Sequence, residues 1–246
     1  PRPSAVLTTC NGCLTSAKTH LPLAAGPPQN YRSRGGMSDL KLGVSYPQQC
    51  HYLLDQQERL LFTLPDQPIS MALYQQLISY NFRRSGDQLY TTYCDQCRAC
   101  QSVRLDMQEF SFSRSQRRLW HRAKAAGWSY RLSQVPDEQR YYPLYQHYIE
   151  SKHRDGSMWP PNQDQMRYLW QSQWQQVVFL EQYLQQELVG VTVVDQLFGV
   201  CSAVYSFYQW PHKLSLGQLA VLALAEHCQT EAIQYIYLGY YVADCT

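Results

Sequence analysis

The stretch "QVVFLEQYL" at residues 176–184, continued by "ELVGVTVVDQL" at 187–197 and "VCSAVYSFY" at 200–208, decides the fold. All three segments are rich in β-branched and aromatic residues, which favour strands. The joins between them are only a few residues long, as in hairpins. The sequence therefore predicts three consecutive strands.

A helix and a fourth strand follow directly. "SLGQLAVLALAEHCQTEA" at 215–232 predicts a helix with Ser215 as its N-cap, and "QYIYLGYY" at 234–241 predicts the strand. Three strands, a helix and a strand on a mixed sheet, with a glycine at the helix start, are the core order of GNAT-type acyltransferases, although other α+β domains share it. We expect an α+β fold with a GNAT-like acyltransferase domain over residues 128–246.

An N-terminal, cysteine-containing domain is expected over residues 37–127. Apolar periodicity predicts helices over four segments, two on either side of that boundary: 69–82, 113–127, 136–152 and 162–174. The segment "VRLDMQEF" at 103–110 alternates as a strand does. No internal repeat is visible.

The composition is that of a globular protein, with 45% hydrophobic and 16% charged residues in 246. The longest apolar run, "LAVLALA" at 219–225, is too short to span a bilayer. A soluble protein without a membrane segment is expected.

Residues 1–36 differ in composition from the rest. They hold four of the 21 basic residues and none of the 19 acidic ones, so the chain from Met37 onward has 17 against 19 and a net charge of −2. An acid-poor targeting leader has this composition. We instead expect Met37 to be the natural start and residues 1–36 to be an upstream artefact or a disordered leader. The C-terminal end, at "YVADCT", is expected to be cut short.

A local basic patch stands out in a chain that is not basic overall. It consists of Arg98, Arg104, Arg114, Arg117, Arg118, Arg122 and Lys124. Within it, "SFSRSQRRLWHR" at 111–122 mixes arginine with serine and aromatic residues, which suits contacts to RNA phosphates and unpaired bases. A solvated helix face is the plainer reading of the same run.

Three cysteines stand three residues apart in "YCDQCRACQSVR" at 93–104, and Cys50 lies upstream. Thiolates at this spacing can converge on one metal ion. We expect Cys50, Cys94, Cys97 and Cys100 to hold a structural zinc ion or an iron–sulfur cluster, which the spacing does not distinguish; His51 is an alternative fourth ligand. Packing as free cysteines is the alternative for this group, and it is the expectation for Cys201, Cys228 and Cys245.

Nine motifs in register carry a resemblance to a known family. They are "QQCHYLLDQQERLL", "FRRSGDQLY", "YCDQCRACQSVRL", "FSFSRSQRR", "YIESKHRDGSM", "VTVVDQL", "SAVYSFY", "SLG" and "YLGYY". Together they run from Cys50 almost to the end of the chain. In these motifs the sequence resembles the arginyl-tRNA–protein transferase family, and within it the bacterial leucyltransferase branch.

The resemblance implies a cytoplasmic aminoacyltransferase. In that branch, leucine passes from leucyl-tRNA to the N-terminal Asp or Glu of a protein, and the product is recognised by the degradation machinery of the N-end rule pathway. It also implies no cofactor for catalysis, and zinc or an iron–sulfur cluster in the N-terminal domain of related members. An arginyl donor is the alternative within the family.

Site residues are predicted on this basis. Orientation of the amine or the ester is assigned to Tyr205, Ser206 and Tyr237 as the catalytic group. An acidic acceptor requires a cationic clamp, best given by arginine. Eight residues are assigned to substrate binding, which covers the acceptor clamp, contacts to tRNA and contacts to the acyl donor. They are Arg83, Arg84, Arg114, Arg117, Arg118, Gly217, Gly239 and Tyr240.

Two departures from the family pattern are visible. Gln209 and Leu214 stand where an acidic residue and an arginine are expected before "SLG", and a closing C-terminal segment with Lys, Tyr and Pro is missing. Outside the family, a metal-containing RNA-binding module without catalysis and a CoA-dependent acetyltransferase are the other hypotheses. The acetyltransferase fits less well, because "KLSLGQLA" has a single glycine where a pyrophosphate loop has several.

Overall fold

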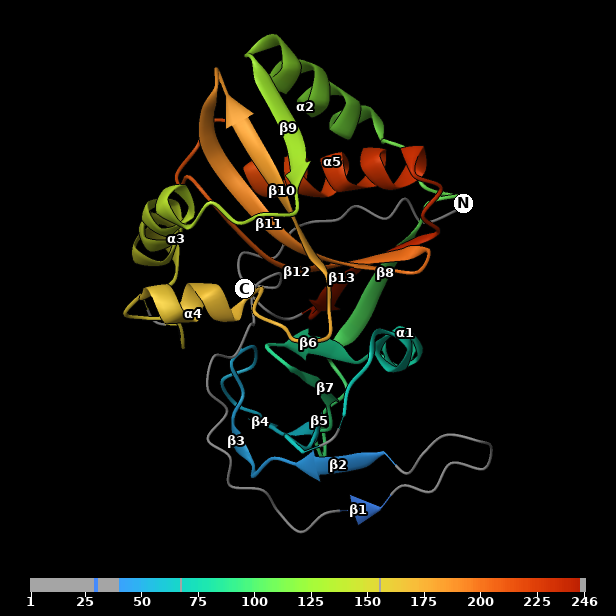
Figure 1. Cartoon of the computed structure of the whole chain (residues 1–246). Coiled ribbons are helices and arrows are strands. Elements are labelled where there is room, and N and C mark those ends of the chain that lie inside the picture. The colour runs from blue at the N-terminus through green and yellow to red at the C-terminus, as the bar shows by residue number, and fades with distance from the viewer. Residues whose placement is uncertain (1–28, 31–39, 67, 155, 244–246) are drawn as a thin grey trace.

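The computed structural model describes residues 29–30, 40–66, 68–154 and 156–243 (Figure 1). The expectation about a leader concerns residues 1–36, of which only 29–30 are described. The expectations about the C-terminal end and about Cys245 concern residues outside the described ranges. Within the described ranges, no helix combines the length and the apolar character that a membrane span needs.

A mixed six-stranded sheet forms the larger part of the molecule. Its strand order is β8-β13-β12-β11-β10-β9. All neighbours are antiparallel except β12 and β13. The strands are β8 (Gln101–Asp106), β9 (Trp128–Ser133), β10 (Val177–Leu184), β11 (Glu187–Leu197), β12 (Val200–Tyr208) and β13 (Tyr235–Tyr241). The α+β class, the mixed sheet and the strand–strand–strand–helix–strand order are confirmed.

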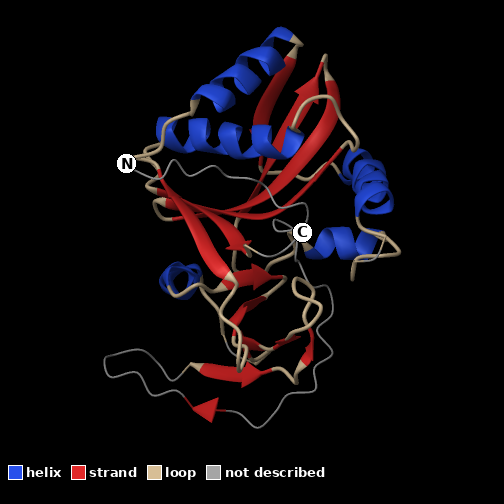
Figure 2. Cartoon of the chain, turned by 180° about the vertical axis from the view of Figure 1, so that it is seen from behind, coloured by secondary structure: helices blue, strands red, loops and turns tan. Residues whose placement is uncertain are grey.

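Helices cover both faces of this sheet (Figures 1 and 2). One face carries α2 (Arg114–Ala125) and α5 (Leu216–Thr230), whose apolar residues share a core with β10, β12 and β13. The other face packs against α3 (Glu138–Lys152) and α4 (Gln163–Tyr168) through a second, tyrosine-rich core. The expected buried positions of Cys201 and Cys228 are confirmed.

Local sequence explains the helix starts. Ser113 and Gln116 form a reciprocal capping box at the start of α2. Ser215 is the N-cap residue of α5 as expected, although its side chain makes no capping hydrogen bond to the described residues. The helix expected over 162–174 ends at Tyr168, and the next carbonyl group, that of Leu169, accepts a hydrogen bond from Arg84 instead of continuing the helix.

The smaller part is an antiparallel sheet with one helix. Its order is β1-β2-β5-β7-β6, with a separate β3–β4 hairpin beside it. The elements are β1 (Gln29–Asn30), β2 (Lys41–Val44), β3 (Gln48–Gln49), β4 (Gln57–Glu58), β5 (Leu60–Thr63), α1 (Met71–Ser79), β6 (Arg83–Ser85) and β7 (Gln88–Thr92). The helix expected over 69–82 is α1, which Ser70 caps through the backbone N–H of Leu73.

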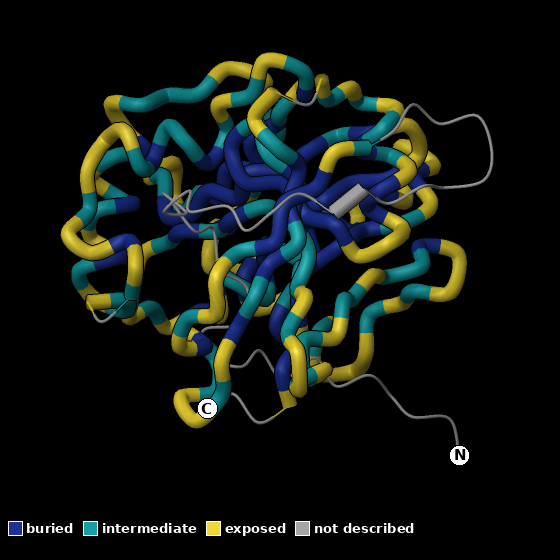
Figure 3. Tube along the Cα trace, turned by 90° about the horizontal axis from the view of Figure 1, so that it is seen from below, coloured by how far each residue is buried: buried dark blue, intermediate teal, exposed yellow. Residues whose placement is uncertain are grey.

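The two parts share a buried joint. Apolar side chains of α1 and β7 pack against residues of β11, β12 and β13, and the buried segments gather in the middle of the molecule (Figure 3). β8 and α2 precede the domain boundary predicted after Gly127, yet they belong in space to the larger part. The segment 93–100, with its cysteines, therefore runs directly from β7 of one sheet into β8 of the other.

Candidate active site

The parallel pair β12 and β13 splays apart along its length. Only Val200–Ser202 of β12 pairs with Tyr235–Tyr237 of β13. Beyond these residues β12 stays on β11 and β13 stays on β8, and a bulge interrupts each of those pairings. Bulges bend the strand that carries them, so the two strands diverge and their facing edges are left without a ladder partner.

Gly239 supports the bulge in β13. Its φ is +92°, a backbone conformation that side chains with a Cβ rarely adopt. A Cβ built on Gly239 would meet nothing within 4 Å among the described residues, so backbone conformation rather than space requires the glycine. Gly239 thus shapes the splay through its backbone conformation.

A small hollow lies where the strands separate, beneath α5. It is lined by Thr192, Ala203, Tyr205, Ser206, Ala220, Val221, Leu224 and Leu238. Two predicted residues, Tyr205 and Ser206, are thus brought together, and the Ser206 hydroxyl lies 2.9 Å from that of Thr192. Burial, together with the neighbouring Tyr145 and Tyr208, raises the pKa of Tyr205 well above its ordinary value. This hydroxyl stays neutral and can donate a hydrogen bond.

Gly217 lies in the first turn of α5, next to a lysine that we did not predict. A Cβ on Gly217 would lie 3.1 Å from the Tyr208 hydroxyl, which accepts a 3.1 Å hydrogen bond from Lys152 Nζ. The same ammonium lies over the rings of Tyr148, Tyr208 and Trp210, at 5.5, 5.4 and 5.0 Å. Lys152 stands in "YIESKHRDGSM", one of the family motifs, and this motif is the signal that could have pointed to it.

The third predicted catalytic residue, Tyr237, is the last residue of β13 that pairs with β12. Its ring lies 5.2 Å from the guanidinium of Arg83, which also lies 5.5 Å from the ring of Tyr240. Its hydroxyl accepts a 3.5 Å hydrogen bond from Arg104 Nη1, and Arg104 had no predicted role beyond the basic patch. Leu238, the residue after Tyr237, lines the hollow, whereas Tyr237 packs in the joint, so the two groups of site residues lie on opposite faces of β13.

Arg84 lies elsewhere, inside the joint between the two parts. Its side chain is fully buried and makes a two-pronged ion pair with Asp195, with a shortest distance of 2.7 Å. The remaining N–H groups reach the carbonyl oxygens of Gly86 and Leu169, both at 3.0 Å. Arg84 therefore presents no open surface to a substrate, and its role in this structure is to hold the joint.

The three arginines of the basic patch that are predicted to bind substrate, Arg114, Arg117 and Arg118, lie on α2. Arg114 and Arg118 are exposed, as is Arg122 one turn further on. α2 contains no acidic residue, and these three guanidinium groups form no ion pair with any described residue. Arg117 instead donates to the Phe112 carbonyl at the start of the helix. Arg114, Arg118 and Arg122 are each four residues apart, so at a rise of 1.5 Å per residue they form one stripe along α2 with steps of about 6 Å.

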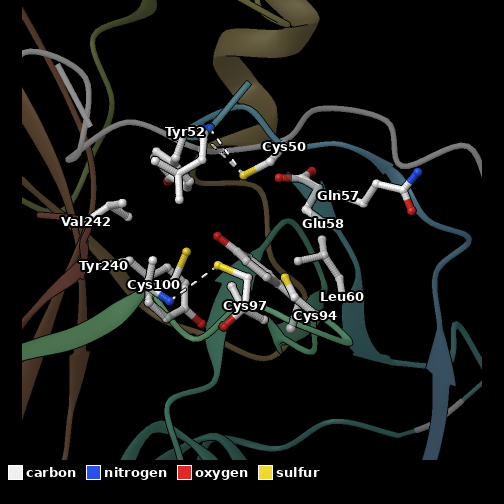
Figure 4. A pocket seen from close by; sticks show the side chains of 14 residues that line it. Cys50, Tyr52, Gln57, Glu58, Leu60, Cys94, Cys97, Cys100, Tyr240 and Val242 are labelled. Carbon is white, nitrogen blue, oxygen red and sulfur yellow. Dashed lines mark hydrogen bonds between the residues drawn. The ribbon is translucent and has the colours of Figure 1, made fainter. Parts of the chain in front are cut away.

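The four predicted metal ligands line one hollow of the smaller part (Figure 4). Cys50 lies beside the β3–β4 hairpin, and Cys94, Cys97 and Cys100 lie on the segment between β7 and β8. Backbone N–H groups of Tyr52 and Leu53 lie 3.4 and 3.5 Å from the Cys50 sulfur, and that of Ala99 lies 3.5 Å from the Cys97 sulfur. Such N–H···S bonds stabilise thiolates in metal sites.

The sulfurs are near one another but not in a coordination geometry. No group of three or more His, Cys, Asp or Glu side chains in the described ranges is arranged to hold a metal ion. His51, the alternative fourth ligand, lies 3.2 Å from the carboxylate of Glu58. The donor set and its N–H···S bonds are of the kind found around a thiolate-bound metal, but the side chains as placed do not form a coordination site.

Comparison with known proteins places this architecture in a family. Residues 48–118 match the family model "Arginine-tRNA-protein transferase, N terminus", and residues 140–246 match "Arginine-tRNA-protein transferase, C terminus". The chain belongs to the arginine-tRNA-protein transferase family. The first match covers the four cysteines, and the second covers the splayed strands and α5.

Curated relatives point to one branch of the family. The chain is 36% identical over 206 residues to the aspartate/glutamate leucyltransferase of Vibrio vulnificus, covering 84% of this chain and 88% of the relative. It is 38% identical over 212 residues to the protein of the same name from Saccharophagus degradans, covering 85% and 89%. Among solved structures, L-PGS from Bacillus licheniformis matches with a TM-score of 0.48 and 14% identity, covering 70% of this chain and 51% of that one.

Proposed function

We propose that this protein transfers leucine from leucyl-tRNA to the N-terminal aspartate or glutamate of other proteins. The observation that carries the proposal is the splay between β12 and β13, which opens a hollow beneath α5 in a chain whose relatives are named aspartate/glutamate leucyltransferases. The larger part is then a GNAT-like acyltransferase domain, with the acyl group between the two strands.

The residues at the hollow suit aminoacyl transfer. An aminoacyl ester is already activated, and an α-amino group has a pKa of about 7.7–8.0, so a useful fraction is neutral near pH 7 without a strong base. Positioning and hydrogen-bond donors at the developing oxyanion then supply most of the rate. In this proposal the protonated hydroxyl of Tyr205 donates such a bond to the acyl group between the strands, while Ser206 and Tyr237 orient the ester and the incoming amine.

The donor tRNA has two contact regions in this proposal. The start of α5, with Gly217 and Lys152, receives a phosphate near the 3′ end, because helix N-termini and ammonium groups both favour anions. The exposed stripe of Arg114, Arg118 and Arg122 on α2 contacts phosphates further along the RNA.

We further propose that Cys50, Cys94, Cys97 and Cys100 hold zinc or an iron–sulfur cluster that orders the segment between β7 and β8. Because β8 carries Arg104 and pairs with β13, metal loss should disturb the site without removing a reacting group. Metal analysis of the purified protein should find stoichiometric metal, and Cys97→Ser should lower both metal content and melting temperature. If the wild type contains no metal and Cys97→Ser has the same melting temperature, the four cysteines are ordinary packing residues.

The activity implies a place in the cell. Aminoacyl-tRNA is a cytoplasmic substrate, so we place the protein in the cytoplasm. A new N-terminal leucine is proposed to mark the acceptor for the degradation machinery of the N-end rule pathway. No cofactor is needed for the transfer itself.

The decisive experiment compares donors and acceptors. Purified protein is given labelled leucyl-tRNA or arginyl-tRNA together with peptides that begin with Asp, Glu or Ala. Leucine should appear on the Asp and Glu peptides and not on the Ala peptide. Transfer from arginyl-tRNA instead would favour the alternative donor, which the name of the family model suggests. RNA binding without transfer from either donor would leave a non-catalytic RNA-binding module.

A further inference from the structure

Two arginines, Arg83 and Arg104, flank Tyr237, and neither forms an ion pair with a described carboxylate. Arg83 on β6 is 5% exposed and contacts the ring of Tyr237, while the exposed Arg104 on β8 donates to its hydroxyl and lies 4.4 Å from the ring of Tyr235. No Asp or Glu in the described ranges forms an ion pair with either guanidinium. A pair of cations therefore meets beside Tyr237, where β13 parts from β12, on the face of the sheet opposite α5.

Arg83 is unusual because it is buried and incompletely bonded. Its Nη1 donates to the Phe82 carbonyl and its Nη2 to the Ser102 hydroxyl, but its Nε is buried and finds no partner among the described residues. Burying a charge without a counter-ion is costly, and the Tyr237 and Tyr240 rings offset only part of that cost.

The neighbouring residue shows the contrast. Arg84 is buried to the same degree, but Asp195 and two carbonyl groups engage its guanidinium. The two adjacent arginines thus differ: Asp195 pairs with Arg84, and no carboxylate of the described residues pairs with Arg83. An anion from outside the chain would complete the environment of Arg83.

We infer that Arg83 and Arg104, on either side of Tyr237, bind the side-chain carboxylate of the acceptor's N-terminal Asp or Glu. This inference rests on the proposed function, because it assigns the acidic specificity of that reaction to two residues. Arginine suits the task, since its planar fork pairs with a carboxylate through two hydrogen bonds. The aromatic rings of Tyr237 and Tyr240 hold Arg83 in place for this contact.

The position agrees with the geometry of an acceptor. In aspartate the side-chain carboxylate is separated from the α-amino group by two carbon atoms, and in glutamate by three. The carboxylate must therefore bind next to the ester. Tyr237 is the last residue of β13 that pairs with β12, so the arginine pair borders the point where the two strands part, on the face of the sheet opposite α5. The long, exposed side chain of Arg104 can adjust to the one-methylene difference between the two acids.

Arg104→Gln is the first test, because Arg104 is exposed and its loss leaves the core intact. The substrates are peptides that differ only in an N-terminal Asp, Glu or Asn. Losing a charge-assisted hydrogen bond should lower kcat/KM for the Asp and Glu peptides about 10-fold or more. The slow transfer to the Asn peptide should fall much less, and the KM for leucyl-tRNA should not change. Arg83→Met should act in the same direction, with Arg83→Lys recovering part of the loss.

Two matched variants serve as controls. Arg140→Gln removes an exposed charge on α3 and should change neither substrate's kinetics. Arg118→Gln on α2 should raise the KM for leucyl-tRNA and leave the preference for acidic peptides intact. Equal losses with the Asp and Asn peptides in Arg104→Gln would overturn the inference. So would a higher KM for leucyl-tRNA, since the pair would then hold an RNA phosphate.

Direct binding separates this inference from the proposed function. A fluorescent peptide beginning with Asp is titrated into the wild type and Arg104→Gln, with the Asn peptide as reference. Tighter binding of the Asp peptide that disappears in Arg104→Gln supports the arginine pair even where no leucine is transferred. Transfer that fails with every peptide contradicts the proposed function alone, whereas equal binding of both peptides to the wild type contradicts the inference.

Discussion

At the scale of single residues, Gly217 joins α5 to the aromatic cluster around Lys152. A methyl group there would lie 3.1 Å from the Tyr208 hydroxyl, closer than Cβ atoms normally approach, and Lys152 holds that hydroxyl in place. Gly217→Ala should therefore push Tyr208 away and raise the KM for leucyl-tRNA several-fold. Alanine favours a helix by up to about 1 kcal/mol over glycine, so the melting temperature should stay the same or rise. Steady-state kinetics and thermal unfolding check the two halves of this prediction.

Tyr208→Phe provides the matched background, because it removes the hydroxyl that the new methyl group would meet. In that background, Gly217→Ala should have almost no further effect on KM, so the two changes should be non-additive. Additive effects would show that Gly217 acts through something other than Tyr208.

Some residue positions could be predicted and others could not. The spacing of Cys94, Cys97 and Cys100 predicted that these residues would line one site, because a tight turn is enough to bring them close. Arg83 and Arg84 look equivalent in "FRRSGDQLY", and only the fold reveals that Asp195, 111 residues further on, lies beside one of them. A contact over that separation leaves no local pattern in the sequence.

At the scale of elements, Glu181 on β10 ties three elements together. It accepts hydrogen bonds from Tyr141 on α3 at 2.5 Å, from Tyr183 at 2.6 Å and from Arg131 on β9 at 2.5 Å. Burial raises the pKa of this carboxyl, but the three hydrogen bonds favour the carboxylate more strongly and the pKa is lowered overall. A carboxyl with a lowered pKa stabilises the fold above its unfolded value of about 4.3 and loses that contribution as the pH falls through the folded value.

Glu181→Gln should therefore reduce the loss of stability on acidification. The free energy of unfolding, measured in urea at pH 6 and pH 3, should fall less in this variant than in the wild type, although the variant is less stable at pH 6. Glu187→Gln, on the exposed start of β11, should keep the wild-type dependence. The same acid dependence in wild type and Glu181→Gln would show that other carboxylates dominate.

Elements were predicted well where the pattern is local. The three strands of the hairpin series and α5 follow from alternation and helical periodicity over a few residues. The strand expected at 103–110 became β8, but its place beside β13 could not be predicted, because pairing depends on which edge is free in the folded sheet. The splay of β12 and β13 depends on two bulges. Only the bulge in β13 is marked in the sequence by a glycine, Gly239.

At the scale of the whole molecule, one polar cluster holds the two parts together. Arg84 of the smaller sheet pairs with Asp195 of the larger one, and the Tyr74 hydroxyl on α1 donates to the same carboxylate at 3.1 Å. Both charged side chains are fully buried. Removing one partner of such a pair leaves the other charge uncompensated, which costs about 3–5 kcal/mol.

Arg84→Met should lower the free energy of unfolding by about that amount, because Asp195 stays buried with Tyr74 as its remaining side-chain partner. Adding Asp195→Asn removes the stranded charge and should restore about 1–3 kcal/mol, since the amide oxygen can still accept from Tyr74. Urea unfolding followed by tryptophan fluorescence reports on the joint through Trp174, which packs against Tyr74, while far-UV circular dichroism reports on the whole chain. At a temperature where Arg84→Met is folded, its KM for acidic peptides should equal that of the wild type, because a buried arginine held by Asp195 meets no substrate. A raised KM with unchanged stability would instead make Arg84 part of the acceptor site.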